Sequence, residues 1–288
     1  MKELTIISGK GGTGKTSIVG SLASLAKDFV LADIDVDAAD LHLIISPTIK
    51  KSNDFMGGHI AIIDPERCTQ CGECVARCQY DAVVDFTIDK IACEGCGVCV
   101  HFCPSDAIDF PQQKCGEWFI SNTAYGPMVH AKLGIAEENS GLLVTTVRKA
   151  AREMAENENR SLVIADGPPG IGCPVIASIT GATAVLIITE PSLSGLHDLK
   201  RVAELAKFLK VPGMLCINKF DLNPEMSQQL KNVARDYQLT YVGKVPYDPS
   251  VTKAMVSGKT PVEFSDGPAS LAIRKVWEKV SDYLDAQQ

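Results

Sequence analysis

The chain has 288 residues, of which 45% are hydrophobic and 22% are charged, and its net charge is −7. This composition is typical of a globular protein with a sizeable core, and no run of eighteen apolar residues predicts a membrane span. Clustered lysine and arginine, which a nucleic acid partner needs, are also missing, because no basic run is longer than a pair such as Lys50–Lys51.

The first residues, MKELTIISGK, enter an apolar strand pattern almost at once. They lack the charged start, apolar run and small-residue cleavage site of a signal peptide, so we expect a cytoplasmic protein. In a reducing compartment, eleven cysteines indicate metal ligation rather than disulfide bonds.

Residues 4–16, LTIISGKGGTGKT, predict a buried strand, a phosphate-binding loop and the beginning of a helix. The loop fits the pattern G-x-x-x-x-G-K-[ST], in the strand–loop–helix context that this pattern requires. Its glycines let backbone N–H groups surround phosphates at the helix N-terminus. Lys15 is expected to neutralise the β- and γ-phosphates, and the Thr16 hydroxyl to bind Mg²⁺. The nucleotide-binding residues predicted in this segment are Gly11, Gly12, Thr13, Gly14, Lys15, Thr16 and Ser17.

A second lysine, Lys10, follows the first glycine of the loop. In this respect the chain resembles the deviant Walker A ATPases, which include MinD, ParA, the arsenite-pump ATPase, the Mrp-type cluster carriers and the nitrogenase iron protein. The resemblance implies ATP as the ligand and a homodimer formed on ATP binding, in which Lys10 reaches the phosphates of the opposite subunit's nucleotide. Such a lysine acts as an arginine finger does, because it cancels transition-state charge only when two subunits close. The alternative is a surface lysine without a role.

Residues 29–43, FVLADIDVDAADLHL, predict a second buried strand that ends in alternating carboxylates. Asp33, Asp35 and Asp37 share one face if the strand continues that far, because the side chains of a strand alternate. The resemblance implies that Asp35 orients or activates the attacking water and that Asp33 lies near the metal. A polar turn is the alternative for this acidic run.

Eight of the eleven cysteines lie within 36 residues, in two copies of the spacing C-x2-C-x2-C-x3-C. The segment IDPERCTQCGECVARCQYDAV (63–83) matches IDKIACEGCGVCVHFCPSDAI (88–108), with every cysteine repeated 25 residues later. Such an internal repeat indicates a module of two similar halves. The spacing is that of bacterial ferredoxins, in which the fourth thiolate of each run ligates the other cluster.

We therefore expect two [4Fe–4S] clusters on these cysteines. The first ligand set is Cys68, Cys71, Cys74 and Cys103, and the second is Cys93, Cys96, Cys99 and Cys78. Gly72 and Gly97 follow the second cysteine of each run, where a bare backbone can fold closely over a cluster. One departure from the ferredoxin pattern is Gln79, which stands where the other run has Pro104. The spacing disfavours two zinc ions or a disulfide staple, since structural zinc sites use distant C-x2-C pairs or histidine.

Three further strands are predicted downstream, over residues 161–170, 182–191 and 213–221. The first, SLVIADGPPG, ends in Asp166, which matches the Walker B aspartate of the same family and is expected to hold Mg²⁺ through water. The glycines of DGPPG can rearrange as switch II when the γ-phosphate leaves.

The base of the nucleotide is expected to lie between two loops near the end of the chain. The resemblance implies that Asn218 reads the adenine edge. It also makes VPYDPSV (245–251) the loop that closes over the base, with Pro246 and Asp248 as contacts.

Three cysteines lie outside the repeat. Cys216 stands in an apolar strand and is expected in the core, and Cys115 has no predicted role. Cys173 lies seven residues after Asp166, a separation at which the nitrogenase iron protein holds a cluster ligand. That resemblance implies a redox or metal ligand at the dimer interface, with a buried structural thiol as the alternative.

The last predicted helix, SLAIRKVWEKVSDYL (270–284), carries an apolar stripe. MinD ends in a membrane-targeting helix, but here the charges are mixed, which favours packing on the sheet edge over membrane binding. We therefore expect no membrane anchor.

Strands that alternate with helices, with acids at the strand ends, predict a doubly wound, mostly parallel α/β sheet. Residues 1–58 and 113–288 are assigned to a P-loop ATPase domain, and residues 59–112 to an inserted bacterial-type 2[4Fe–4S] ferredoxin domain. Almost the whole chain thus resembles the MinD-superfamily P-loop ATPases that contain an inserted ferredoxin domain.

The resemblance implies an ATP-hydrolysing iron–sulfur protein whose ATP and ADP states are coupled to its two clusters. Its catalytic residues are then Lys10, Lys15 and Asp35, and its Mg²⁺ site comprises Thr16, Asp33 and Asp166. Electron transfer to an unidentified redox partner is the leading hypothesis, because a complete eight-cysteine set favours permanent clusters. The alternative is a scaffold or carrier of the Mrp type that delivers clusters to apo-proteins. Positioning on a membrane or on DNA is disfavoured by the missing anchor and the acidic charge.

Overall fold

The computed structural model describes residues 1–134 and 140–287 and divides into two compact units. The first, which we call the sheet unit, comprises Met1–Ser52, Trp118–Lys132 and the residues from Ser140 onward. The second, which we call the cysteine unit, comprises Asn53–Glu117 and, among the described residues, also Leu133 and Gly134.

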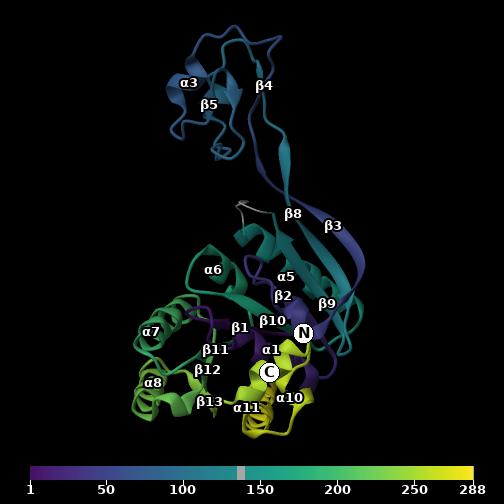
Figure 1. Cartoon of the computed structure of the whole chain (residues 1–288), viewed down its shortest axis with the longest axis vertical. Coiled ribbons are helices and arrows are strands. Elements are labelled where there is room, and N and C mark those ends of the chain that lie inside the picture. Colours follow the sequence, from purple (N-terminus) through teal and green to yellow (C-terminus); the bar gives the residue numbers. More distant parts are fainter. Residues whose placement is uncertain (135–139, 288) are drawn as a thin grey trace. The chain divides into compact units, whose positions relative to one another are not determined.

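A sheet of nine strands has the order β13-β12-β11-β1-β10-β2-β9-β8-β3 (Figure 1). The strands are β1 Lys2–Ser8, β2 Phe29–Asp33, β3 Thr48–His59, β8 Gln112–Asn122, β9 Pro127–Leu133, β10 Leu162–Pro169, β11 Ala184–Thr189, β12 Gly213–Asn218 and β13 Thr240–Val245. The seven strands from β13 to β9 pair in parallel. Their carboxyl ends therefore meet at one edge, which is where ligands bind in doubly wound folds. The expected mostly parallel α/β sheet is confirmed.

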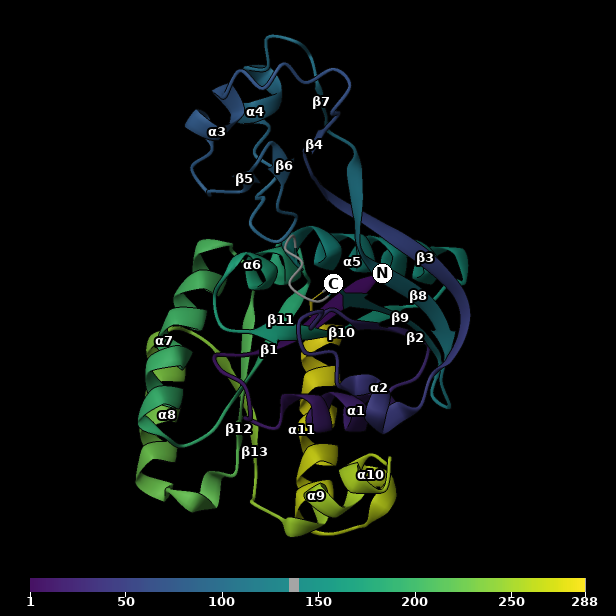
Figure 2. The same ribbon diagram turned by 45° about the horizontal axis from the view of Figure 1, so that its top comes forward.

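Helices cover both faces of the sheet (Figure 2). They are α1 Lys15–Leu25, α2 Leu41–Ile45, α5 Ser140–Asn157, α6 Cys173–Ile179, α7 Leu193–Phe208, the short 3₁₀ turn η1 Phe220–Leu222, α8 Pro224–Asp236, α9 Pro249–Val256, α10 Pro261–Phe264 and α11 Pro268–Asp285. Along β1, Leu4 and Ile6 pack with α1, α2 and α11, whereas Ile7 packs with α6, α7 and α8. This division follows from the alternation of side chains along a strand, and it buries β1 on both faces.

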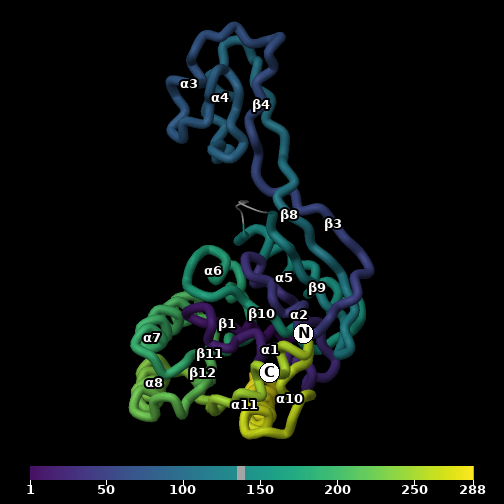
Figure 3. Tube along the Cα trace, in the orientation of Figure 1, coloured from purple at the N-terminus to yellow at the C-terminus, as the bar shows by residue number. Residues whose placement is uncertain are grey.

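The last helix, α11, packs against the edge strand β13, as the mixed charges of its sequence predict. Its apolar stripe, which includes Ile273, Val276 and Val280, lies in the core. In the part of the chain that the structure describes, no helix has both the length and the hydropathy to cross a membrane. Near its end, Asp285 pairs with Lys2 at 2.9 Å, and Figure 3 shows the two chain ends side by side.

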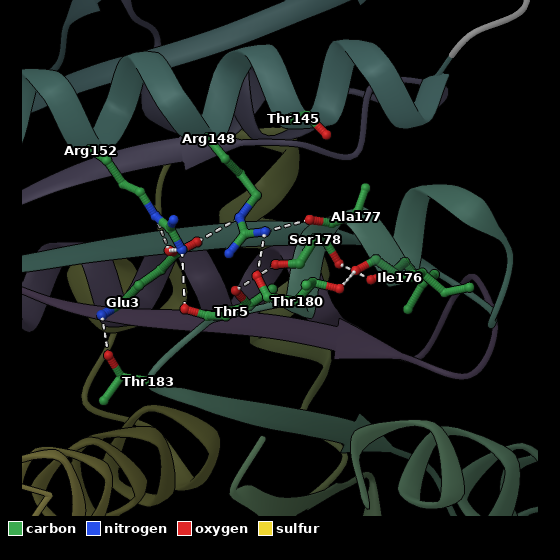
Figure 4. A network of polar contacts seen from close by, with 12 residues as sticks. Glu3, Thr5, Thr145, Arg148, Arg152, Ile176, Ala177, Ser178, Thr180 and Thr183 are labelled. Atoms are coloured by element: carbon green, nitrogen blue, oxygen red, sulfur yellow. Dashed lines mark hydrogen bonds and ion pairs between the residues drawn. The ribbon is translucent and has the colours of Figure 1, made fainter. Parts of the chain in front are cut away.

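A buried network of charges joins β1 to the helices α5 and α6 (Figure 4). Glu3 accepts a hydrogen bond from Arg148 Nε at 2.7 Å and pairs with Arg152 as well. Arg148 in turn donates to the carbonyl oxygens of Ala177 and Thr180. Because a buried charge is costly unless it is paired and hydrogen-bonded, this network fixes how α5 and α6 lie against the sheet.

The cysteine unit repeats one small pattern twice, as its sequence does. Its elements are the antiparallel pair β4 Ile62–Ile63 and β7 Ile108–Asp109, the hairpin β5 Val83–Val84 and β6 Thr87–Ile88, and the short helices α3 Glu73–Arg77 and α4 Val98–His101. Each helix begins after a glycine in the left-handed region, Gly72 with φ 83° and Gly97 with φ 73°. These glycines supply backbone angles that a side chain disfavours.

Candidate functional site

A pocket of about 390 Å³ lies at the carboxyl edge of the parallel strands. It brings together every residue that the sequence predicts to bind nucleotide: Gly11, Gly12, Thr13, Gly14, Lys15, Thr16, Ser17, Asn218, Pro246 and Asp248. Asp35 also lines it, and so do further residues that the sequence analysis did not single out, among them Lys219, Tyr247 and Met255. The pocket therefore has one wall from the phosphate-binding loop and another from the segments after β12 and β13.

Lys15 is buried at the floor of this pocket, with its side chain 6% exposed. Its Nζ lies 3.2 Å from Asp35 Oδ2 and also pairs with Asp166. Burial lowers the pKa of Lys15, but the negative charges of Asp166 and Asp35 outweigh that effect, and the pKa is raised. The lysine is therefore a fixed positive charge beside the expected phosphate position.

Three carboxylates gather around this single lysine, those of Asp33, Asp35 and Asp166. Burial raises the pKa of all three acids, to about 6 in the case of Asp35. Asp33 Oδ2 and Asp35 Oδ1 are buried without any hydrogen-bond partner. The Thr16 hydroxyl hydrogen-bonds the Asp166 carboxylate. Surplus negative charge and unpartnered carboxylate oxygens beside a hydroxyl are the donor set that suits Mg²⁺, so these residues fit the ion that the sequence predicts.

Gly14 and Asn218 lock the phosphate-binding loop onto β12. Gly14 has φ 86°, and a Cβ at this position would lie 2.3 Å from Asn218 Nδ2, so no side chain fits. Asn218 Nδ2 donates to the Thr13 carbonyl at 2.7 Å, while its Oδ1 accepts from the Lys219 N–H at 3.0 Å. Both ends of the amide thus contact the protein, and the adenine-reading role of Asn218 stays a prediction.

Lys10 forms contacts within its own chain. Its Nζ lies 2.7 Å from Glu190 Oε1 and donates to Ser194 Oγ at 2.9 Å. The second oxygen of Glu190 accepts from Lys219 Nζ, which also donates to the Gly12 carbonyl at 2.9 Å. Sequence reasoning missed Glu190 and Lys219, although each lies near the end of a predicted strand, at the same edge as the loop. The role of Lys10 in a second subunit stays a prediction.

The eight repeated cysteines line two separate hollows in the cysteine unit. One is lined by Cys68, Cys71, Cys74 and Cys103, and the other by Cys78, Cys93, Cys96 and Cys99. The structure thus groups the sulfurs in the two sets that the ferredoxin spacing predicts. Backbone N–H groups point at two of the sulfurs in equivalent places, from Ala82 to Cys78 at 3.4 Å and from Ala107 to Cys103 at 3.3 Å. Among the described residues, 1–134 and 140–287, no three side chains of His, Cys, Asp or Glu lie close enough together to hold a single metal ion.

The hollows suit thiolate-bound clusters in their chemistry. Each offers four sulfurs, and the walls between them are apolar, with Phe86 and Ile108 in the first and Val83 and Phe110 in the second. Solvent exclusion by apolar walls and N–H···S hydrogen bonds are two of the features by which proteins set a cluster's potential.

The three remaining cysteines differ in exposure. Cys216 is fully buried in β12, as predicted, and burial raises its thiol pKa to about 12. Cys115 on β8 is buried too. Cys173 is exposed at the first residue of α6, so it is not the buried thiol that was its alternative. Its role as an interface ligand stays a prediction.

Comparison with known proteins agrees with this geometry. The family model of the CobQ/CobB/MinD/ParA nucleotide binding domain matches residues 4–262. The chain is 33% identical over 285 residues to the protein MJ0578 of Methanocaldococcus jannaschii, and the match covers 98% of this chain and 97% of that protein. It is 23% identical to a protein of Pyrococcus furiosus named iron-sulfur cluster carrier protein, over 98% of this chain and 86% of the relative.

Solved structures share the fold. The septum site-determining protein MinD from Pyrococcus horikoshii, complexed with Mg-ADP, superposes with a TM-score of 0.61 at 15% identity, over 100% of this chain and 98% of the other. The family model spans the phosphate-binding loop, the three carboxylates and the segments after β12 and β13. The chain therefore belongs to the CobQ/CobB/MinD/ParA family of nucleotide-binding proteins.

Proposed function

We propose that this chain is a nucleotide-hydrolysing iron–sulfur protein, in which the nucleotide state of a homodimer is coupled to two [4Fe–4S] clusters that transfer electrons. The observation that carries the proposal is the presence, in one chain, of a complete phosphate-binding pocket and of two hollows with four cysteines each. ATP is the nucleotide that the family implies.

The pocket supplies what triphosphate hydrolysis needs. Backbone N–H groups of the loop and Lys15 hold the β- and γ-phosphates, and this charge stabilises the transition state. Asp35 lines the pocket with one unpartnered oxygen, from which it can orient the attacking water and accept its proton. Lys10 of each subunit, once released from Glu190, would complete the site of the other subunit.

Thr16, Asp33 and Asp166 would hold Mg²⁺, which, when bound, neutralises phosphate charge. Lys15 now pairs with the carboxylates of Asp35 and Asp166. An incoming γ-phosphate competes for the same ammonium group. Nucleotide binding would therefore loosen Lys15 from the acids at the ends of β2 and β10, and these are the segments that would sense the nucleotide.

The cysteine unit would hold the two clusters permanently, which supply one-electron chemistry when bound. Eight cysteines stay available as thiolate ligands only in a reducing compartment, and the cytoplasm is such a compartment. Residues 53–117 contain eleven Asp and Glu and four Lys and Arg, so the whole net charge of −7 lies here. An acidic surface of this kind steers a redox partner with a basic face.

A second candidate is delivery of clusters to apo-proteins. It is favoured by the printed name of the P. furiosus relative, iron-sulfur cluster carrier protein. The two functions differ in the lability of the iron, because a carrier loses a cluster to an acceptor when nucleotide is added and an electron carrier retains both.

The test is an anaerobic redox titration followed by EPR, with and without saturating Mg²⁺ and nucleoside triphosphate. We expect two [4Fe–4S] signals and a shift of at least one potential on nucleotide binding. Potentials and spectra that are identical in both states would exclude coupling. Preparations that contain zinc, or no iron, would exclude the clusters themselves.

A further inference from the structure

Another open pocket, of about 460 Å³, lies along the outer strand of the sheet unit. Among the described residues, β13 is the last strand of its sheet and pairs with β12 alone. We call this pocket the β13 groove, and its lining residues are Phe220, Lys231, Tyr241, Val242, Gly243, Lys244, Pro246, Pro268, Leu271, Ala272, Lys275, Val276 and Lys279. Only Pro246 also lines the nucleotide pocket, so the groove is a separate feature of the surface.

The groove follows the free edge of the sheet. Tyr241 packs with α8 on one face of the sheet and Val242 with α11 on the other, yet both residues line this one pocket (Figure 2). A pocket that is shared by both faces of a strand runs along the strand's backbone. In the described part of the chain, residues 241–244 make no backbone hydrogen bond beyond the pairing with β12. Backbone groups on the outer side of β13 are therefore able to pair with another chain.

Four lysines surround the groove, and no acidic residue lines it. They are Lys231 on α8, Lys244 on β13, and Lys275 and Lys279 on α11. Among the described residues, none of the four forms a salt bridge. Because the chain outside residues 53–117 is neutral overall, these unpaired lysines make the groove a local concentration of positive charge.

Two of the lysines are held in place by aromatic rings. Lys244 Nζ lies 3.7 Å from the centroid of the Phe220 ring, and Lys231 Nζ lies 4.4 Å from the centroid of the Tyr241 ring. Such cation–π contacts restrict a long side chain before a ligand arrives, so less conformational entropy is lost on binding. They also cover one face of each ring, which disfavours the stacking that a single-stranded nucleic acid uses.

The rest of the groove is apolar. Leu271 is 50% exposed, and Ala272 and two prolines line the same surface. Lysines on an edge strand guard it against pairing with another sheet, but three of the four lysines here stand on helices. Apolar surface, cationic groups and a free strand edge together are complementary to an extended peptide that alternates acidic and apolar side chains. The register of β13 shifts between Tyr241 and Gly243, so the regular edge is short and side-chain contacts carry most of the binding.

We propose that the β13 groove docks an extended acidic segment of a partner protein, whose carboxylates pair with the four lysines. Pro246 lines both the groove and the nucleotide pocket, so the docked segment lies next to the loop that is expected to close over the base. The proposal goes beyond the proposed function, because neither hydrolysis nor the clusters enter the argument.

The test measures the fluorescence anisotropy of a labelled peptide that alternates glutamate and valine, added to the whole chain purified anaerobically. Saturating Mg²⁺ and ADP keep the acidic probe out of the nucleotide pocket. We expect saturable binding that weakens as salt is added, because exposed charges are screened. The uncharged peptide that alternates glutamine and valine should bind at least about tenfold more weakly. If the acidic peptide does not bind, the lysines only guard the edge and the proposal is overturned. An oligothymidylate that binds as tightly as the peptide would overturn it as well, since the groove would then select any polyanion.

A pair of charge reversals locates the binding site. Lys275→Glu combined with Lys279→Glu changes two exposed residues of α11 and should weaken binding of the acidic peptide about tenfold or more. The matched control, Lys200→Glu combined with Lys207→Glu, makes the same change of net charge at two exposed positions of α7 and should leave the peptide affinity unchanged. Both proteins should retain the circular dichroism spectrum of the unmodified chain. A groove variant that keeps its peptide affinity, or a control that loses as much, would refute this location.

Discussion

The substitution Lys10→Ala should weaken the nucleotide-dependent dimer. In the single chain Lys10 pairs with Glu190 at 2.7 Å, with the two side chains 33% and 20% exposed. A pair this exposed is worth about 0.2–1 kcal/mol, which is what each subunit loses on releasing the lysine. A charged hydrogen bond to phosphate in the opposite subunit is worth about 1.5–3 kcal/mol. With two such exchanges per dimer, the net loss is about 1–6 kcal/mol, or roughly 5- to 10,000-fold in the dimer dissociation constant.

Sedimentation velocity with Mg²⁺ and a non-hydrolysable triphosphate measures this constant directly. The companion variant Glu190→Gln should act in the opposite sense, because it removes the charge that holds Lys10 in the monomer. It is expected to tighten the dimer by roughly 2- to 30-fold, the full range of the two released pairs. A Lys10→Ala protein that dimerises as tightly as the unmodified chain would refute the cross-subunit role, and a Glu190→Gln protein with a weaker dimer would refute the competition.

Three other predictions concern the clusters, the pH dependence and the loop. Cys103→Ala should lower the iron content from about eight to about four per chain, because Cys103 lines only one of the two hollows. Iron and sulfide analysis measures this content, and loss of all iron would contradict two independent sites. Burial raises the pKa of Asp35 to about 6, above the usual value of 3.8. If ionised Asp35 accepts the proton of the attacking water, the hydrolysis rate should fall tenfold per pH unit below about pH 6, and a rate that is flat between pH 5 and 7 would rule this out. Gly14→Ala, with a Cβ 2.3 Å from Asn218 Nδ2 and φ 86°, should cost about 1–3 kcal/mol in the free energy of unfolding. Urea denaturation, followed by a spectroscopic signal from the sheet unit, measures this free energy. Gly11→Ala is the control, because a Cβ at that position meets nothing within 4 Å.

Local patterns predicted those parts of the chain that short-range physics determines. The loop and its helix follow from the pattern G-x-x-x-x-G-K-[ST] after an apolar strand, which is the signature of a phosphate-binding loop. The parallel sheet follows from continuous apolar runs such as FVLAD and LVIAD, which are typical of strands buried on both faces. The grouping of Cys78 and Cys103 with the opposite run follows from the ferredoxin spacing, in which the fourth thiolate of each run ligates the other cluster.

Other features depended on contacts between distant residues and escaped the sequence. Glu190 and Lys10 are 180 residues apart, and nothing near either predicts their pairing. The amide of Asn218 is turned toward the loop because Gly14 leaves space for it, a relation that appears only when β12 stands near β1. The strands β8 and β9 extend the sheet beyond β2. Pairing partners of strands are set by the whole fold, and propensity alone does not give them.

The ion pair between Lys2 and Asp285 has a practical consequence for engineering this protein. Because Lys2 at the start of the first strand pairs with Asp285 at the end of the last helix, a short glycine–serine linker can join these two elements without distorting the sheet unit. New ends can then be opened in an exposed turn of the cysteine unit, such as Lys90–Ile91. A circular permutant of this kind would carry an affinity tag or electrode tether beside the sulfur-lined hollows and leave the triphosphate pocket untouched.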